Sequence, residues 1–140
     1  GLLLFSTDGA FGNALLHPSH EVEKRYDAVI DGSLTEEQAD RLRAGVSIGD
    51  GKGRTRPAQV DVLGSVDLGA RHGRGTKVSV TIHEGRHRQV RKMFRAVGHT
   101  VIALDRSAFG PLVLGDLAVG AWRMLTDAEV TAVYHASGTR

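Results

Sequence analysis

The sequence predicts an α+β domain, in which a mixed and largely antiparallel sheet has flanking helices. Segments predicted to be strands outnumber segments predicted to be helices. The two kinds of segment do not alternate regularly along the chain, which disfavours the repeated βα units of a parallel sheet. The 140 residues, 41% of them hydrophobic, are enough for one domain with a hydrophobic core.

The first half of the chain is expected to hold two strands and two helices, followed by a short strand before a glycine-rich loop. In order, these are a buried strand at residues 2–7, a helix at 10–16, a strand at 23–31, a helix at 36–44 and the short strand at 46–48. Pro18 ends the first helix, since proline disfavours helical backbone in the residue before it. The second helix begins at a capping box formed by Thr35 and Gln38.

The second half is expected to hold a pair of strands, a basic helix and a terminal helix. In order, these are strands at 57–66 and 76–83 joined by a basic connection at 69–75, a helix at 86–97, a strand at 101–104, a mostly irregular segment at 105–120, a strand at 121–125 and a helix after 126. Val78, Val80 and Ile82 alternate with polar residues and define the buried face of their strand. Thr126 and Glu129 form a second capping box.

The composition excludes several classes of site. The chain has no cysteine, so disulfides, thiol catalysis and thiolate zinc sites are excluded. Its longest strongly apolar run, at residues 2–5, is far too short to cross a bilayer, and a cytoplasmic protein is expected. The formal net charge is +2, from 18 Lys and Arg against 16 Asp and Glu, so the distribution of charge is more informative than its total.

Residues 86–97 combine a packing face with a basic face. On a helix, the apolar residues of this segment share one side: Val90, Met93, Phe94 and Val97. Five of the 18 Lys and Arg residues also lie here, with no Asp or Glu among them: Arg86, Arg88, Arg91, Lys92 and Arg95. Close like charges on a helix repel by about a few tenths of a kcal/mol per pair. A helix that tolerates this repulsion is expected to meet an anion, such as RNA phosphates or a buried carboxylate.

The same region contains H-E-G-R-H at residues 83–87, which matches the H-E-x-x-H pattern of zinc proteases. In those enzymes both histidines lie on one face of a helix. Here His83 ends a predicted strand, and Gly85 separates it from the predicted helix. His83 and His87 are therefore expected to point in different directions, so no metal is expected, and a zinc hydrolase stays an alternative.

Tyr26 has two interpretations. It lies in the middle of the predicted strand at 23–31, beside Lys24 and Arg25. It is either a half-buried strand aromatic or a ring that stacks on a base while the cations meet phosphates. The residues alone favour the first interpretation.

Four blocks of the sequence carry a family resemblance. They are GLLLFSTDG at the start, HPSHEVEKRY, TIHEGRHRQVRKMFRAVGH and FGPLVLGDLAVGAWRMLT, and PAQV after the glycine-rich loop also fits. Together they resemble the RsuA/RluB-type ribosomal RNA pseudouridine synthases. The blocks follow one another in order over nearly the whole chain, and GRHRQVRKMF and GPLVLGDL are the most specific.

The resemblance implies an enzyme that isomerises a uridine in ribosomal RNA without cofactor or metal. The sugar is detached from the uracil and rejoined to its carbon 5, with covalent catalysis by an Asp carboxylate on a flipped nucleotide. By motif match, Tyr26 stacks on the uracil, and Arg91 pairs with the catalytic Asp and keeps it ionised and oriented. The residues implied to contact the RNA are Lys24, Arg86, Arg88, Gln89, Lys92 and Arg95.

One part of the family pattern is not in the sequence. In the family, the catalytic Asp lies in a G-R-L-D segment a few residues before the GLLL strand, and this chain starts at that strand. We therefore expect residues 1–140 to be a single, N-terminally truncated catalytic domain that is inactive alone. An alternative from another class is a non-catalytic RNA-binding module that uses the basic helix at 86–97.

Overall fold

The computed structural model describes residues 1–17 and 20–138. Within them, five strands form one sheet in the order β2-β3-β1-β4-β5, and every neighbouring pair is antiparallel. The strands are β1 (Lys24–Asp31), β2 (Gln59–Asp67), β3 (Arg74–Ile82), β4 (Val101–Phe109) and β5 (Leu112–Val113). The helices are α1 (Gly9–Leu16), α2 (Glu36–Ala44), α3 (Gln89–Ala96) and α4 (Asp127–Ala136). The predicted α+β class with a largely antiparallel sheet is confirmed.

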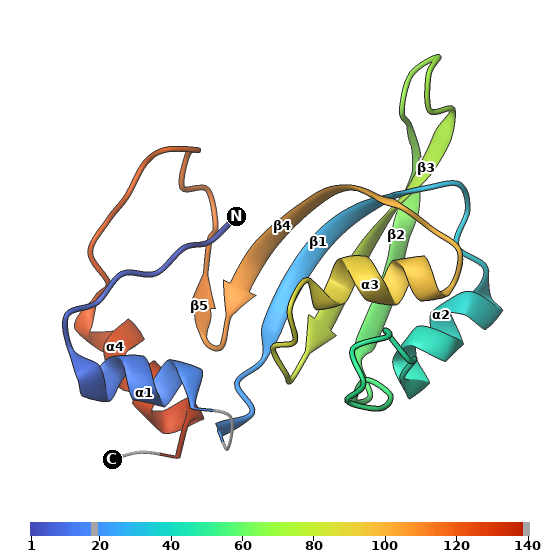
Figure 1. The fold of residues 1–140 in the computed structure, drawn as a ribbon. Coiled ribbons are helices and arrows are strands. Elements are labelled where there is room, and N and C mark those ends of the chain that lie inside the picture. The colour runs from blue at the N-terminus through green and yellow to red at the C-terminus, as the bar shows by residue number, and fades with distance from the viewer. Residues whose placement is uncertain (18–19, 139–140) are drawn as a thin grey trace.

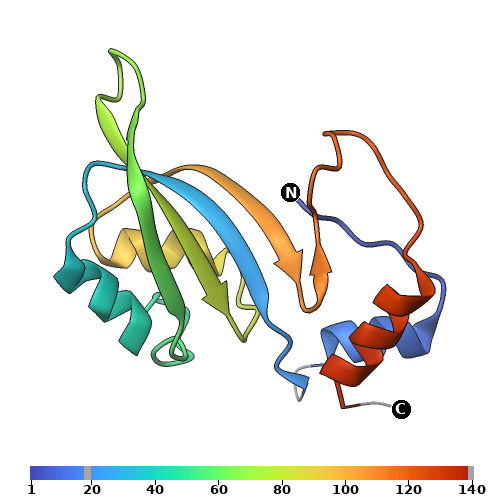
Figure 2. The same ribbon diagram turned by 180° about the vertical axis from the view of Figure 1, so that it is seen from behind.

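Helices α2 and α3 lie against one face of the sheet (Figure 1). The core between them includes Ile30 of β1, Val78 of β3, Leu42 of α2 and Phe94 of α3, all of which are almost fully buried. Seen from behind, the other face of the sheet carries no helix of the described residues (Figure 2). Polar side chains that could form a site on the helix-covered face therefore lie at the margins of this core.

A second apolar cluster joins α1 and α4 to the end of β4. Phe11 of α1 meets Tyr134 of α4 edge to face, with 6.0 Å between ring centroids and 77° between ring planes. Phe109 at the end of β4 and Leu112 of β5 belong to the same cluster. The sheet therefore connects two separate cores, and the start of β1 lies between them.

The predicted strands at residues 2–7 and 121–125 are wrong. Leu2 donates its backbone N–H to the carbonyl of Arg106 at 2.7 Å, but Leu3 and Phe5 are 66% and 88% exposed. Trp122, in the second segment, is 80% exposed. Apolar sequence suggested buried strands in both places, but neither segment has strand pairing within the part of the chain that the structure describes.

Three other boundaries also differ from the prediction. β4 continues to Phe109, through a segment expected to be irregular, because residues 105–109 pair with the start of β1. The strand expected at 46–48 is reduced to a bridge between Ser47 and Arg54. Helix α3 begins at Gln89 and not at residue 86, because the backbone of Arg88 is left-handed, with φ of 51°.

Both predicted capping boxes are confirmed. In each, the threonine side chain accepts from a backbone N–H three residues later, and the glutamine or glutamate there binds the threonine N–H: Thr35 with Gln38, and Thr126 with Glu129. Pro18, expected to end the first helix, lies outside the described residues. Within the described part of the chain, no helix has the length and hydropathy to cross a membrane.

Candidate active site

Tyr26 lies on the helix-covered face of the sheet, at the margin of the main core. Residues two apart on a strand share a face, and Ala28 and Ile30 are buried in the core that includes α3. Tyr26 is only half-buried and packs against that core. Part of its ring is therefore accessible on the same face as α3.

Lys24 lies on this face two residues nearer the start of β1. Its Nζ donates to the backbone carbonyl of Glu84 at 3.2 Å, in the corner between β3 and α3. Burial and then the charge of Arg106 lower the pKa of Lys24, while Glu84 acts in the opposite direction. A Cβ at Gly85 would lie 3.1 Å from Nζ, so the glycine leaves room for the lysine.

Arg106 joins this group from β4 and was not among the predicted site residues. It lies opposite Tyr26 in the β1–β4 ladder. Its Nε and Nη2 donate to the carbonyl of Leu2 at 3.2 and 2.8 Å, and its Cζ lies 4.8 Å from the centroid of the Phe109 ring. Because residues 105–120 were expected to be irregular, no sequence pattern placed this side chain on a particular face.

Arg91 lies in the first turn of α3, at the end of the helix that is nearer the start of β1 (Figure 1, Figure 2). Its side chain is half-buried. It makes no hydrogen bond or ion pair with any residue that the structure describes. A half-buried guanidinium usually has an acceptor, so the donors of Arg91 are available to an anion.

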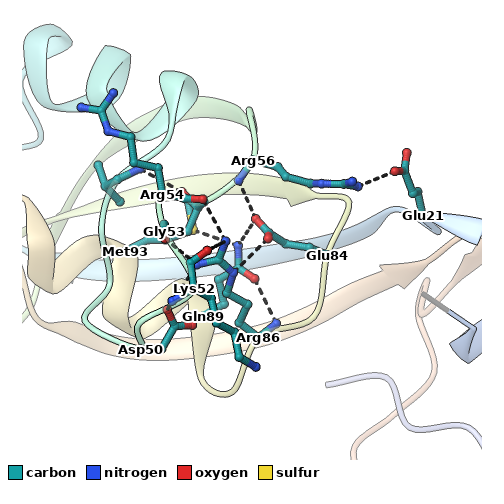
Figure 3. A network of polar contacts seen from close by, with 12 residues as sticks. Glu21, Asp50, Lys52, Gly53, Arg54, Arg56, Glu84, Arg86, Gln89 and Met93 are labelled. Atoms are coloured by element: carbon teal, nitrogen blue, oxygen red, sulfur yellow. Dashed lines mark hydrogen bonds and ion pairs between the residues drawn. The ribbon is translucent and has the colours of Figure 1, made fainter. Parts of the chain in front are cut away.

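Arg86 is held by acceptors of the protein, and its expected contact with RNA stays a prediction. Its Nε donates to Glu84 Oε1 at 3.1 Å, and its Nη1 donates to Asp50 Oδ1 at 3.3 Å (Figure 3). Its other bonds reach backbone carbonyls of the glycine-rich loop, those of Lys52, Gly53 and Arg54. The side chain is 13% exposed, so Arg86 anchors this loop to the start of α3.

Gln89 is 3% exposed, and its expected contact with RNA likewise stays a prediction. Its amide donates to Glu84 Oε2 at 2.9 Å and accepts from the backbone N–H of Arg86 at 3.1 Å (Figure 3). Arg88, the N-cap residue, supplies no side-chain cap. The Glu84 carboxylate therefore holds both the loop and the first residue of the helix.

The other three predicted phosphate contacts have accessible side chains. Arg88 and Arg95 are exposed, and Lys92 is half-buried. Within the described residues, none of the three side chains makes a hydrogen bond or ion pair. Their contact with RNA phosphates stays a prediction.

The histidines of the H-E-x-x-H match do not share a helix. His83 directly follows β3, whereas α3 begins only at Gln89. His83 Nε2 lies 3.8 Å from a carboxylate oxygen of Glu23. Among the described residues, no group of three or more His, Asp or Glu side chains is arranged to hold a metal ion. The sequence pattern therefore lacks the helical geometry that gives it meaning in zinc proteases.

Comparison with known proteins identifies the family of the chain. A family model described as RNA pseudouridylate synthase matches residues 1–96. The chain belongs to the RNA pseudouridylate synthase family. The matched residues include Tyr26 and Arg91, as well as the corner that holds Glu84 and Arg86. The resemblance that the sequence blocks suggested is confirmed.

Relatives within the pseudouridylate synthase family are similar over most of the chain. Ribosomal large subunit pseudouridine synthase B of Bacillus subtilis is 42% identical over 130 residues, which are 93% of this chain and 51% of the relative. Ribosomal small subunit pseudouridine synthase A of Escherichia coli is 34% identical over 134 residues, which are 95% of this chain and 54% of the relative. The chain thus spans about half the length of these curated relatives.

A solved pseudouridylate synthase also has the same fold. That crystal structure superposes with a TM-score of 0.80 at 29% sequence identity, and the match covers 91% of this chain and 52% of the other. The shared fold includes the antiparallel sheet on which Tyr26 lies.

Proposed function

We propose that this chain belongs to the catalytic domain of an enzyme that converts one uridine of ribosomal RNA into pseudouridine. The observation that carries the proposal is Arg91, a half-buried guanidinium with no partner among the described residues. It lies in the QVRKMF block, where the family resemblance implies an arginine that pairs with the catalytic Asp. Relatives named for both ribosomal subunits support ribosomal RNA as the substrate.

In the proposed reaction, the target nucleotide leaves its stack and its uracil lies against Tyr26. A carboxylate paired with Arg91 stays ionised and oriented, and provides covalent catalysis. The bond between N1 and C1′ breaks and a bond between C5 and C1′ forms. C5 loses its proton to water and N1 gains one, so the product is an isomer of the substrate. Arg88, Lys92 and Arg95 meet RNA phosphates in this proposal.

We also propose that residues 1–140 alone do not catalyse this isomerisation. No carboxylate of the described residues pairs with Arg91. The reaction needs one there, and no Asp of this chain occupies the family's G-R-L-D motif. The nucleophile is therefore expected from a segment of the full-length protein outside these residues.

Release of tritium from RNA labelled at carbon 5 of uridine tests both proposals, because that hydrogen is lost on isomerisation. We expect release from unmodified large- or small-subunit ribosomal RNA with the full-length protein, and background levels with residues 1–140 alone. Release by residues 1–140 would refute their inactivity. RNA binding without release by the full-length protein would favour the non-catalytic RNA-binding module.

A further inference from the structure

Lys24 and Arg106 bring two positive charges to one aromatic ring. Lys24 Nζ lies 5.6 Å from the centroid of the Phe109 ring, and Arg106 Cζ lies 4.8 Å from it. In the β1–β4 ladder, Lys24 is opposite Phe109, and Arg106 is opposite Tyr26. All four side chains therefore belong to one face of the sheet, and the two cations lie beside the aromatic residue proposed to stack on the target base.

No carboxylate of the described residues forms an ion pair with either cation. The charge of Glu84 acts to raise the pKa of Lys24, but the carboxylate oxygens of Glu84 are bound by Arg86 and Gln89. Burial, followed by repulsion from Arg106, lowers the pKa of Lys24. The fold therefore holds two like charges close together, and a bound anion would offset their electrostatic repulsion.

Both cations also retain donors that the protein does not use. The bonds from Arg106 to the Leu2 carbonyl occupy Nε and Nη2 and leave Nη1 without an acceptor among the described residues. The ammonium group of Lys24 has three donors, one of which reaches the Glu84 carbonyl. Together these free donors suit an anion with several oxygens, as in a phosphate group.

We propose that Lys24 and Arg106 jointly bind one phosphate of the RNA backbone next to the target uridine. This inference rests on the proposed function, because it takes RNA as the substrate. A phosphate held there would fix the backbone of the extruded nucleotide at the start of β1 while its base meets Tyr26. The site is distinct from the basic face of α3, whose cations would contact RNA phosphates farther from the target uridine.

Neutralising one phosphate at a time tests the proposal. A short RNA hairpin that the full-length enzyme converts is synthesised with a single uncharged methylphosphonate at each linkage in turn. For the wild-type enzyme, we expect one linkage beside the target uridine to lower affinity by roughly 10- to 100-fold when neutralised. Lys24→Gln and Arg106→Gln should bind the unmodified hairpin with a comparable loss of affinity. Neutralising that linkage should then lower the affinity of either variant little further.

The salt dependence of binding gives a second measurement on the same variants. Each of the two substitutions should reduce the slope of log affinity against log salt by about 0.7–0.9, the value for one phosphate contact. Arg106→Lys keeps the charge, so it should retain the slope and the sensitivity to the linkage. This variant and Lys24→Gln still test the site if Arg106→Gln does not fold.

Arg25 is the matched control. It is a cation of the same strand, but its Nε donates to Ser107 Oγ at 3.0 Å on the opposite face of the sheet. Arg25→Gln should respond to every neutral linkage as the wild-type enzyme does.

Two results would overturn the phosphate site while leaving the proposed function intact. In the first, the wild-type enzyme isomerises the hairpin, but Lys24→Gln and a folded Arg106→Gln respond to the neutral linkages as the wild-type enzyme does. In the second, each variant loses the same RNA affinity whichever linkage is neutralised, so that no single phosphate is linked to Lys24 and Arg106. Failure of the wild-type protein to release tritium would instead overturn the proposed function.

Discussion

The side-chain amide of Gln89 donates to the carboxylate of Glu84 at 2.9 Å, which ties the first residue of α3 to the corner that follows β3. The same carboxylate accepts from Arg86, whose guanidinium extends into the loop before β2. Helix α3 has no side-chain N-cap, and this network holds its first residue through the side chain of Gln89. The position of Arg91, two residues into the helix, depends on contacts from distant parts of the chain.

Replacing Arg86 should destabilise the fold. Arg86→Ala would leave Glu84 and several loop carbonyls without their shared donor in a partly buried setting, at a cost of about 2–4 kcal/mol. Urea denaturation measures the free energy of unfolding. The control is Arg88→Ala, which removes an exposed cation from the same corner and should change stability by less than about 0.5 kcal/mol. Equal effects would mean that the network does not hold the corner.

Arg91 and Arg95 should differ in what they contribute to the full-length enzyme. Arg91→Ala removes the proposed partner of the catalytic carboxylate, so kcat should fall by about 100-fold or more. Arg95→Ala removes an exposed cation of the same helix, so it should mainly weaken RNA binding, with a salt slope smaller by about 1. Steady-state kinetics at several salt concentrations separate the two effects. Purely binding-type losses of equal size from both variants would contradict the assigned roles.

The elements that the sequence predicted well are those determined by neighbouring residues. The capping boxes at Thr35 and Thr126 and the alternation in β3 depend on spacings of two or three positions, and all are confirmed. Long-range pairing could not be inferred in the same way. β4 reaches Phe109 because β1 pairs with it, whereas residues 121–125 find no strand partner within the described chain despite an apolar sequence.

In the candidate site, too, local motifs could be predicted from the sequence, whereas contacts between distant residues could not. Tyr26 and Arg91 were identified by motif match, and the structure places both on the helix-covered side of the sheet. Arg106 could not be identified, because its proposed role depends on lying opposite Tyr26 in a strand pair. The charge of Arg86 was visible in the sequence, and its contact with RNA stays a prediction. The loop carbonyls that bind Arg86 could not be inferred, because they lie more than thirty residues away in the chain.

His99 should stabilise the junction between β1 and α2. Its Nδ1 lies 2.7 Å from the backbone carbonyl of Asp31, and its Nε2 lies 2.9 Å from the side-chain oxygen of Gln38. His99→Ala would deprive both oxygens of this partner and should cost about 1–3 kcal/mol. Urea denaturation provides the measurement, with His72→Ala in the exposed turn between β2 and β3 as the control. If the two alanine variants are equally stable, the His99 contacts contribute nothing measurable.

Glu129 should make stability depend on pH in the acid range. Its hydrogen bonds from Arg123, at 2.8 and 2.7 Å, are the largest cause that lowers its pKa from 4.5 to about 2. Because the folded-state pKa lies below the unfolded value, this contribution is complete above about pH 4.5 and is lost as pH falls toward about 2. Urea denaturation across this range should show a shallower loss of stability for Glu129→Gln than for the wild-type chain. Glu37→Gln, which removes an exposed carboxylate of α2 that has no ion pair within the described residues, should retain the wild-type slope. Identical slopes for Glu129→Gln and the wild-type chain would show that the pair with Arg123 does not contribute.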